Sequence, residues 1–335
     1  MKKRLVVLLT VILFLGLTPK PVSGMDFIEW EEVIVENGRP FIWVIKVDPI
    51  DNSIIYVGTE SGLYKSIDAG LTWTLLINRG TKVLAIDPFD NQTMYLGDFY
   101  GHLYKTTDGG ENYLKLPFIN DQVSDLVVDP SNPMNVFVTT TFDGLFKTTD
   151  AGETWDCVWN QIGIYFLLPH PTQEDIFFAG TSLGLFKTDD SGKTWRQVVL
   201  PVNNDMVLGL TINPNNPDIM FAATYSVGVV KSVDGGESFF WNGSQLLNKP
   251  ALAVSFDPST CKVYVVVRHQ GVYVSTDYGK NWQKCDKGLP SYEISIILPN
   301  PSRRGSMFAA IYRGALYTSV LPEMDFELNY SLIIK

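Results

Sequence analysis

A pattern of eight residues that occurs six times constrains the fold of this chain more than any other feature. It reads Ser or Thr, any residue, Asp, any residue, Gly, any residue, a small polar residue and an aromatic residue, and residues 66–73 are its first copy. Its aspartates are Asp68, Asp108, Asp150, Asp190, Asp234 and Asp277, so successive copies lie 40, 42, 40, 44 and 43 residues apart. A near-constant period in this range indicates a repeat architecture.

Each copy has the composition of a tight turn. Asp and Ser/Thr side chains hydrogen-bond nearby backbone N–H groups, and Gly adopts positive φ without steric cost. The closing aromatic residue begins the next strand and fills space between sheets. A row of aspartates is also compatible with metal binding or catalysis. Because every Asp stands two residues before a Gly, we interpret all six as structural turn residues and predict no metal site.

The segments between these turns predict β-strands. Short β-rich runs such as residues 83–86 and 94–97 are bounded by Asp/Asn-Pro and Gly signals, and no helical period of useful length occurs. Four such strands per unit describe one blade of a β-propeller. The first strands of the units begin near Ile42, Val83, Val123, Ile164, Val207, Leu252 and Ile294. We therefore predict an all-β, seven-bladed β-propeller of four-stranded antiparallel blades.

The seventh unit lacks the repeated aspartate, and Val320 stands in its place. A ring of blades is closed when a strand from one terminus joins the blade of the other. Residues 29–35 resemble the strands that follow the turns, so we expect this N-terminal segment to be the outer strand of blade seven. Residues 329–334 are the alternative.

The repeated pattern resembles the Asp-box, or BNR, repeat of β-propellers. Such propellers occur in sialidases, xyloglucanase-type glycosidases, sortilin-type receptors and photosystem II assembly factors. The resemblance covers nearly the whole chain after residue 24 and implies the propeller fold with Asp-box turns. It does not select one function, because these families use one scaffold for unrelated tasks.

Residues 1–24 have the features of a secretory signal peptide. A basic start (residues 2–4) precedes an apolar run (residues 5–17) and a small-residue end (residues 22–24). The apolar run is short for a membrane span, and a retained anchor is the alternative. We therefore predict that residues 25–335 form a single propeller domain, secreted or periplasmic, monomeric, with no membrane span after cleavage.

Composition excludes several classes of function. A net charge of −10 argues against nucleic acid as the main partner. Three cysteines, Cys157, Cys261 and Cys285, rule out a complete disulfide framework, and we expect free thiols or at most one bonded pair. The three histidines show no ligand spacing, and the glycines follow the turns rather than a phosphate-binding loop. We predict no cofactor.

The loops of a propeller lie on two faces. The repeated turns share one face with the uniform Asp/Asn-Pro loops, whereas the loops between second and third strands and between blades differ in every unit. We call the second face the variable face and expect the ligand there. The predicted ligand-binding residues are Arg39, Arg79, Asp98, Tyr100, Asp143, Arg268, His269, Tyr312 and Arg313.

The four arginines in this set belong to neighbouring blades: six, seven, one and two. Arginine suits bidentate recognition of carboxylates, and three arginines hold the substrate carboxylate in sialidases. Solvated loop charge is the alternative interpretation. A sialidase is disfavoured because residues 38–40 only partly match its Arg-Ile-Pro signature, and neither Tyr312, Tyr292 nor Glu293 can be assigned as a catalytic group.

A glycosidase of the xyloglucanase type is the other enzymatic alternative. Glycoside hydrolysis needs two carboxylates, for which Asp98 and Asp143 are the candidates, and Trp159, Trp241 and Tyr100 are candidate sugar platforms. Those enzymes place their cleft between two propellers, and this chain supplies one. The leading hypothesis is an exported, non-enzymatic propeller that recognises a protein, peptide or glycan on its variable face.

Overall fold

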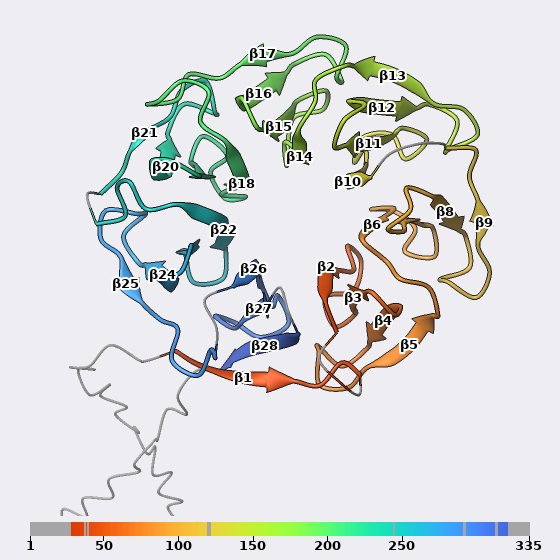
Figure 1. Ribbon diagram of the computed structural model, residues 1–335, viewed down its shortest axis with the longest axis horizontal. Coiled ribbons are helices and arrows are strands. Elements are labelled where there is room, and N and C mark those ends of the chain that lie inside the picture. The colour runs from red at the N-terminus through yellow and green to blue at the C-terminus, as the bar shows by residue number, and fades with distance from the viewer. Residues whose placement is uncertain are drawn as a thin grey trace, which may run out of the picture.

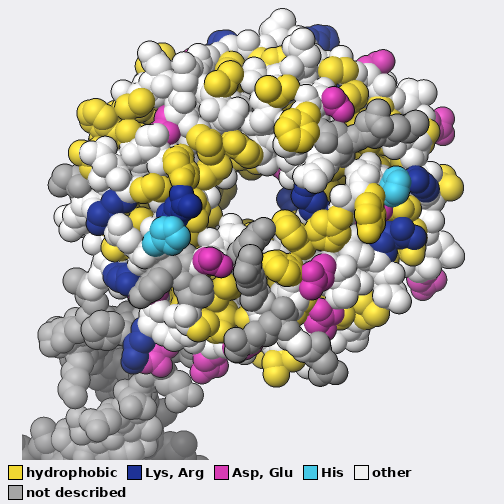
Figure 2. All heavy atoms as spheres, viewed as in Figure 1, with side chains coloured by type: hydrophobic (Ala, Val, Ile, Leu, Met, Phe, Trp, Pro, Cys, Tyr) yellow, Lys and Arg dark blue, Asp and Glu magenta, His cyan; other side chains and the backbone are white. Residues whose placement is uncertain are grey.

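The computed structural model describes residues 28–36, 38, 40–118, 122–243, 245–290, 293–311 and 314–320. These residues form seven four-stranded antiparallel sheets that stand around a central channel (Figures 1 and 2). No helix occurs within the described ranges, so none there could cross a membrane. The predicted seven-bladed β-propeller is confirmed. The predicted signal peptide, residues 1–24, lies outside the described residues.

The strands of each blade run in order from the channel outward. Blade one has β2 (Ile42–Val47), β3 (Ile55–Thr59), β4 (Leu63–Ser66) and β5 (Thr74–Ile77); blade two has β6 (Val83–Ile86), β7 (Met94–Gly97), β8 (Leu103–Thr106) and β9 (Leu114–Lys115); blade three has β10 (Val123–Val128), β11 (Val136–Thr140), β12 (Leu145–Thr148) and β13 (Asp156–Trp159); blade four has β14 (Ile164–Pro169), β15 (Phe177–Thr181), β16 (Gly184–Thr188) and β17 (Arg196–Gln197).

The remaining blades follow the same plan. Blade five has β18 (Val207–Ile212), β19 (Met220–Thr224), β20 (Gly228–Ser232) and β21 (Phe240–Trp241); blade six has β22 (Ala251–Asp257), β23 (Lys262–Val267), β24 (Gly271–Ser275) and β25 (Gln283–Lys284); blade seven has β26 (Ile294–Pro299), β27 (Met307–Ile311), β28 (Ala315–Val320) and β1 (Glu29–Val33). The predicted starts of the innermost strands agree with these bounds to within one residue.

The N-terminal strand closes the ring. β1 pairs antiparallel with β28, from Glu29 opposite Val320 to Val33 opposite Leu316, and the two strands lie side by side in Figure 1. Trp30 is buried and its indole N–H donates to the carbonyl of Cys285 at 2.7 Å, which also ties the strand to blade six. The expectation for the N-terminal segment is therefore confirmed. The alternative segment, residues 329–334, lies outside the described residues.

The hydrophobic core is divided among the interfaces between blades. Seven clusters of buried residues occur in the described chain, and each combines side chains of two neighbouring blades. The cluster between blades four and five, for example, joins Phe178 and Leu185 to Val207 and Met220. All three cysteines are unpaired, and only Cys285 is buried.

The repeated turns are built by a dense set of hydrogen bonds. In blade three, Asp150 Oδ1 accepts from the Thr148 hydroxyl at 2.6 Å and from the backbone N–H of Thr154 at 2.9 Å. Its Oδ2 accepts from the Thr154 hydroxyl at 2.6 Å, while Thr148 Oγ1 accepts from the N–H of Gly152 at 2.9 Å. Hydrogen bonds from Thr148 and Thr154 lower the pKa of Asp150 to about 2. Bonds of the same kind lower the pKa of Asp68, Asp108 and Asp190 to about 2.

Each turn also packs against the preceding blade. Every second strand has an almost fully buried aromatic residue at its second position, or at its third in β23, and the set is Tyr56, Tyr95, Phe137, Phe178, Phe221, Tyr264 and Phe308. Phe178 of blade four lies so close to Gly236 of blade five that a Cβ there would be 2.6 Å from its ring. Phe308 of blade seven meets Gly70 of blade one in the same way, at 2.9 Å.

Lysines of the third strands also connect each blade to the turn of the next blade. Lys187 lies over the Phe178 ring with its Nζ 5.5 Å from the centroid, and this Nζ donates to the carbonyl of Gly235 at 3.3 Å. Lys105, Lys147 and Lys231 donate to turn carbonyls of the next blade at 3.2–3.3 Å. A turn thus stabilises its own blade and its junction with the previous one.

Replacement of Gly236 by Ala tests this junction. Gly236 has φ +79°, so Ala there loses about 1–2 kcal/mol from the left-handed backbone, and overpacking against Phe178 costs about 1–3 kcal/mol more. Gly235→Ala is the matched control, because Gly235 has φ +71° but open space, with its nearest atom 3.6 Å from the added Cβ. Urea unfolding measures both variants. Equal losses would contradict the packing role.

Acid sensitivity tests the turn carboxylates. The folded pKa of about 2 lies below the ordinary value of 3.8, so the stabilisation is complete above pH 3.8 and is lost as the pH falls toward 2. We expect the urea midpoint to fall steeply across this window. A chain carrying Asp68→Asn and Asp150→Asn should begin with a lower midpoint and show a shallower decline. An unchanged slope would show that other groups cause the acid sensitivity.

Candidate functional site

The variable face carries the loops between second and third strands and the connections between blades. Figure 2 shows this face: hydrophobic side chains gather around the channel mouth, and acidic and basic side chains lie between and outside them. Of the nine predicted ligand-binding residues, the structure describes Arg79, Asp98, Tyr100, Asp143, Arg268 and His269. Arg39, Tyr312 and Arg313 lie outside the described residues, so their role stays a prediction.

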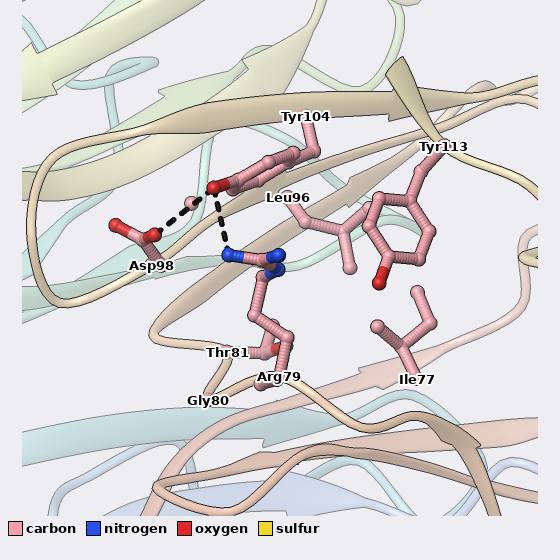
Figure 3. A pocket seen from close by; sticks show the side chains of 9 residues that line it. Ile77, Arg79, Gly80, Thr81, Leu96, Asp98, Tyr104 and Tyr113 are labelled. Carbon is pink, nitrogen blue, oxygen red and sulfur yellow. Dashed lines mark hydrogen bonds between the residues drawn. The ribbon is translucent and has the colours of Figure 1, made fainter. Parts of the chain in front are cut away.

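Arg79 lies at the junction of blades one and two and is held by two tyrosines. Its Nη1 donates to the Tyr104 hydroxyl at 2.9 Å, and its guanidinium carbon is 4.5 Å from the centre of the Tyr104 ring and 5.8 Å from that of Tyr113 (Figure 3). Burial, followed by the nearby Asp98 carboxylate, raises the pKa of Tyr104. The pocket that these residues line holds about 10 Å³, room for one water molecule at most.

Arg268 has a similar environment on the other side of the ring. It donates a hydrogen bond to the Tyr225 hydroxyl and its guanidinium carbon lies 5.5 Å from the centre of that ring. Tyr225 belongs to blade five and Arg268 to blade six, so this pair also bridges two blades. The adjacent His269 is exposed, with a left-handed backbone at φ 58°. Both described arginines of the predicted cluster thus already have tyrosine partners.

Asp98 supports the loop between β7 and β8. Its side chain is buried, and Oδ1 accepts from the backbone N–H groups of Tyr100 at 2.8 Å and His102 at 3.0 Å. Oδ2 lies 3.0 Å from His102 Nδ1 and accepts from the Tyr104 hydroxyl at 3.3 Å. Both oxygens of this carboxylate are therefore engaged inside blade two.

The other blades explain why an acceptor is needed at this position. A threonine closes the second strand there in four blades, at Thr59, Thr140, Thr181 and Thr224. Thr59 Oγ1, for example, accepts from the N–H groups of Ser61 and Gly62 at 3.2 and 3.1 Å. Asp98 makes the same kind of turn bonds one blade further on. Comparison of the repeats in the sequence could have found this equivalence.

Asp143 lies in the corresponding loop of blade three. Its side chain is exposed, and its backbone N–H donates to Thr140 Oγ1 at 3.0 Å. Asp98 and Asp143 therefore differ in environment, since one carboxylate is enclosed in its loop and the other faces solvent. Among the described residues, no group of three His, Cys, Asp or Glu side chains is arranged for a metal ion.

The three candidate sugar platforms also differ from one another. Trp159 belongs to β13, where it stacks on Trp195 with ring centres 4.7 Å apart and an interplanar angle of 12°. It is therefore part of the packing between blades three and four. Trp241 lies on the outer strand β21 and is 51% exposed, and Tyr100 is 84% exposed on the variable face.

An aromatic cluster that the sequence did not single out lies beside the channel mouth. Phe41 stacks on Trp43 with ring centres 6.1 Å apart, and the edge of Phe99 meets Trp43 at 5.1 Å. Trp43 belongs to the innermost strand β2, where the register shift between Ile42 and Val44 leaves it outside the ladder. Such a bulge re-aims a side chain. Nothing in the local sequence marks it, because both neighbours are apolar.

Comparisons with known proteins agree with the propeller fold. The family model "Sortilin-Vps10: Sortilin, neurotensin receptor 3" matches residues 143–293, and the sequence resembles sortilin-type propellers over that part. No curated protein matches the chain.

The solved structures show the fold alone, since their sequence identities are low. The GH74 xyloglucanase from Xanthomonas campestris is 16% identical with a TM-score of 0.68; the match covers 86% of this chain and 53% of the xyloglucanase, so this chain spans about half its length. YCF48 from Cyanidioschyzon merolae is 14% identical with a TM-score of 0.67, over 87% of this chain and 98% of YCF48. YCF48 bound to D1 peptide is 16% identical with a TM-score of 0.63, over 88% and 95%.

Substitution of Asp98 tests whether this residue serves as a hydrogen-bond acceptor that supports its loop. Asp98→Thr should unfold at nearly the wild-type urea midpoint, because threonine accepts the same kind of bonds in four other blades. Asp98→Ala leaves the N–H groups of Tyr100 and His102 without their acceptor and should cost about 1–3 kcal/mol. If the two variants lost equal stability, the turn role of Asp98 would be wrong.

Proposed function

We propose that this chain is an exported propeller that binds a protein or peptide on its variable face and carries no catalytic site there. The observation that carries the proposal is the environment of Asp98. A general acid or nucleophile must reach the scissile bond, whereas this carboxylate is buried and satisfied by groups of its own blade. Export is inferred from the signal-like residues 1–24.

The other predicted residues divide into two groups. Tyr100, Asp143 and His269 have exposed or partly exposed side chains on variable loops and remain candidates for ligand contact. Arg79 and Arg268 are exposed but already bonded to tyrosines, so a ligand would meet a preformed Arg–Tyr pair. We retain both as contact residues and reassign Asp98 from contact to loop support. Among similar folds, YCF48 is known with a bound D1 peptide, which supports peptide recognition on such a scaffold.

A glycoside hydrolase is the second candidate. It is favoured by the exposed Asp143 and by the fold that this chain shares with the GH74 xyloglucanase. Hydrolysis needs a second carboxylate within about 5–9.5 Å of the first. The enclosed position of Asp98 disfavours it for that role.

A paired assay on residues 25–335 decides between binding and hydrolysis. Xyloglucan is the polysaccharide probe, reducing-end release is the readout, and Asp143→Asn and Asp98→Thr are the variants. We expect no release from any of the three proteins, and saturable binding of peptides from a labelled library that Asp98→Thr keeps within about threefold. Release that disappears with Asp143→Asn would overturn the proposal and identify a glycosidase.

A further inference from the structure

The rings of Phe41, Trp43 and Phe99 are in contact, and Tyr100 follows Phe99 in the same loop. The cluster of these four residues is unlike the buried aromatic residues of the second strands. The seven aromatic residues of the second strands are at most 1% exposed. Phe41, Trp43 and Phe99 are only half-buried and Tyr100 is 84% exposed. We call this cluster the aromatic ledge. Because its residues come from blades one and two, it spans a blade junction beside the channel mouth on the variable face.

The ledge is held in place by its surroundings. A Cβ at Gly80 would lie 2.9 Å from the Phe99 ring and 2.5 Å from the carbonyl oxygen of Glu60, so Phe99 fits against a connection that has no side chain there. Asp98 holds the backbone of the same loop through Tyr100. The Phe99 ring and the backbone of this loop are therefore already ordered before binding, which lowers the entropy cost of binding.

One acidic residue, Glu60, lies at the blade-one side of the ledge, because its carbonyl oxygen and the Phe99 ring meet the same glycine, Gly80. Glu60 is exposed on the loop between β3 and β4. Glu36 contacts the same loop, accepting from the Ser61 hydroxyl at 2.6 Å and from the Tyr64 hydroxyl. The positive charge of Arg79 is held over the rings of Tyr104 and Tyr113 (Figure 3). Glu60 thus gives the ledge a negative charge at its blade-one side, in a chain of net charge −10.

We infer that the aromatic ledge docks a peptide segment in which an aromatic or aliphatic side chain stands next to Lys or Arg. The apolar side chain packs on Phe99 and Tyr100, and the basic group pairs with Glu60. A charged group beside an apolar surface suits a basic peptide better than a neutral sugar, and the Glu60 carboxylate therefore favours the peptide. Complementary charge at the border sets specificity and association rate. The inference rests on the proposed peptide-binding function and names its ligand class and subsite.

Three fluorescein-labelled peptides test the inference by anisotropy on residues 25–335. The first alternates Lys and Phe with Gly spacers, the second has Glu in place of Lys, and the third has Ser in place of Phe. We expect the first to bind about tenfold more tightly than either of the others. We also expect its affinity to fall with added salt.

Matched variants locate the site. Tyr100→Ala should weaken the Lys/Phe peptide about tenfold, and Glu60→Gln about threefold with no effect on the Glu/Phe peptide. The controls are Phe89→Ala and Glu111→Gln, which change exposed residues of blade two in the Asp-Pro loop and the repeated turn of the opposite face and should leave affinity unchanged. The melting temperature of each variant verifies that it is folded.

The remaining outcomes distinguish an error in the docking site from an error in the proposed function. Binding that survives both Tyr100→Ala and Glu60→Gln, or equal affinity for the Lys/Phe and Glu/Phe peptides, would overturn the ledge assignment and leave peptide binding standing. If no labelled peptide binds while xyloglucan is retained and its retention is lost with Tyr100→Ala, the ledge is a glycan site and both proposals are overturned.

Discussion

The contact between the glycine of each turn and an apolar side chain of the preceding blade is the constraint on which the ring depends. This side chain is an aromatic ring beside Gly70, Gly192, Gly236 and Gly279 and a leucine beside Gly110 and Gly152. The glycine must have a positive φ for its own turn, and it must also lack a Cβ because the neighbouring side chain lies against that space, as Phe178 does beside Gly236. Lys187 covers the ring and bonds the same turn. Local turn chemistry and packing between blades therefore meet at one residue, which makes a short motif a strong determinant of the fold.

This arrangement separates the two faces by function. The turn face is occupied by the hydrogen bonds of the carboxylates and by the junctions between blades, and its loops are nearly uniform. The loops of the variable face do not form these repeated contacts, so their sequences are free to differ. Where those loops carry aromatic rings and charges beside the channel mouth, as at Phe99, Tyr100 and Glu60, the rigid blades present them in a fixed arrangement.

Asp98 differs in type from the threonines at the equivalent position of four other blades, but it has the same structural role. Alone, an aspartate on a variable loop suggests chemistry or ligand contact. Beside Thr59 and Thr140, which accept N–H groups at the equivalent position, it is a turn acceptor that also holds His102 and Tyr104. A carboxylate with these bonds is part of the scaffold, which favours a ligand-binding function over glycoside hydrolysis.

The sequence by itself determined the seven blades, the four strands in each, the turn residues and the closing strand, because all of these depend on short motifs repeated at a regular spacing. It also separated uniform from variable loops. Only the tertiary structure decided which residues of the variable face meet. Arg79 proved to lie between Tyr104 and Tyr113, Trp159 proved to be stacked on Trp195, and Phe41 and Trp43 joined Phe99 across a blade junction. The physical reason is that such contacts depend on which side chains of neighbouring blades are brought face to face, and the loop residues that make these contacts do not repeat along the chain.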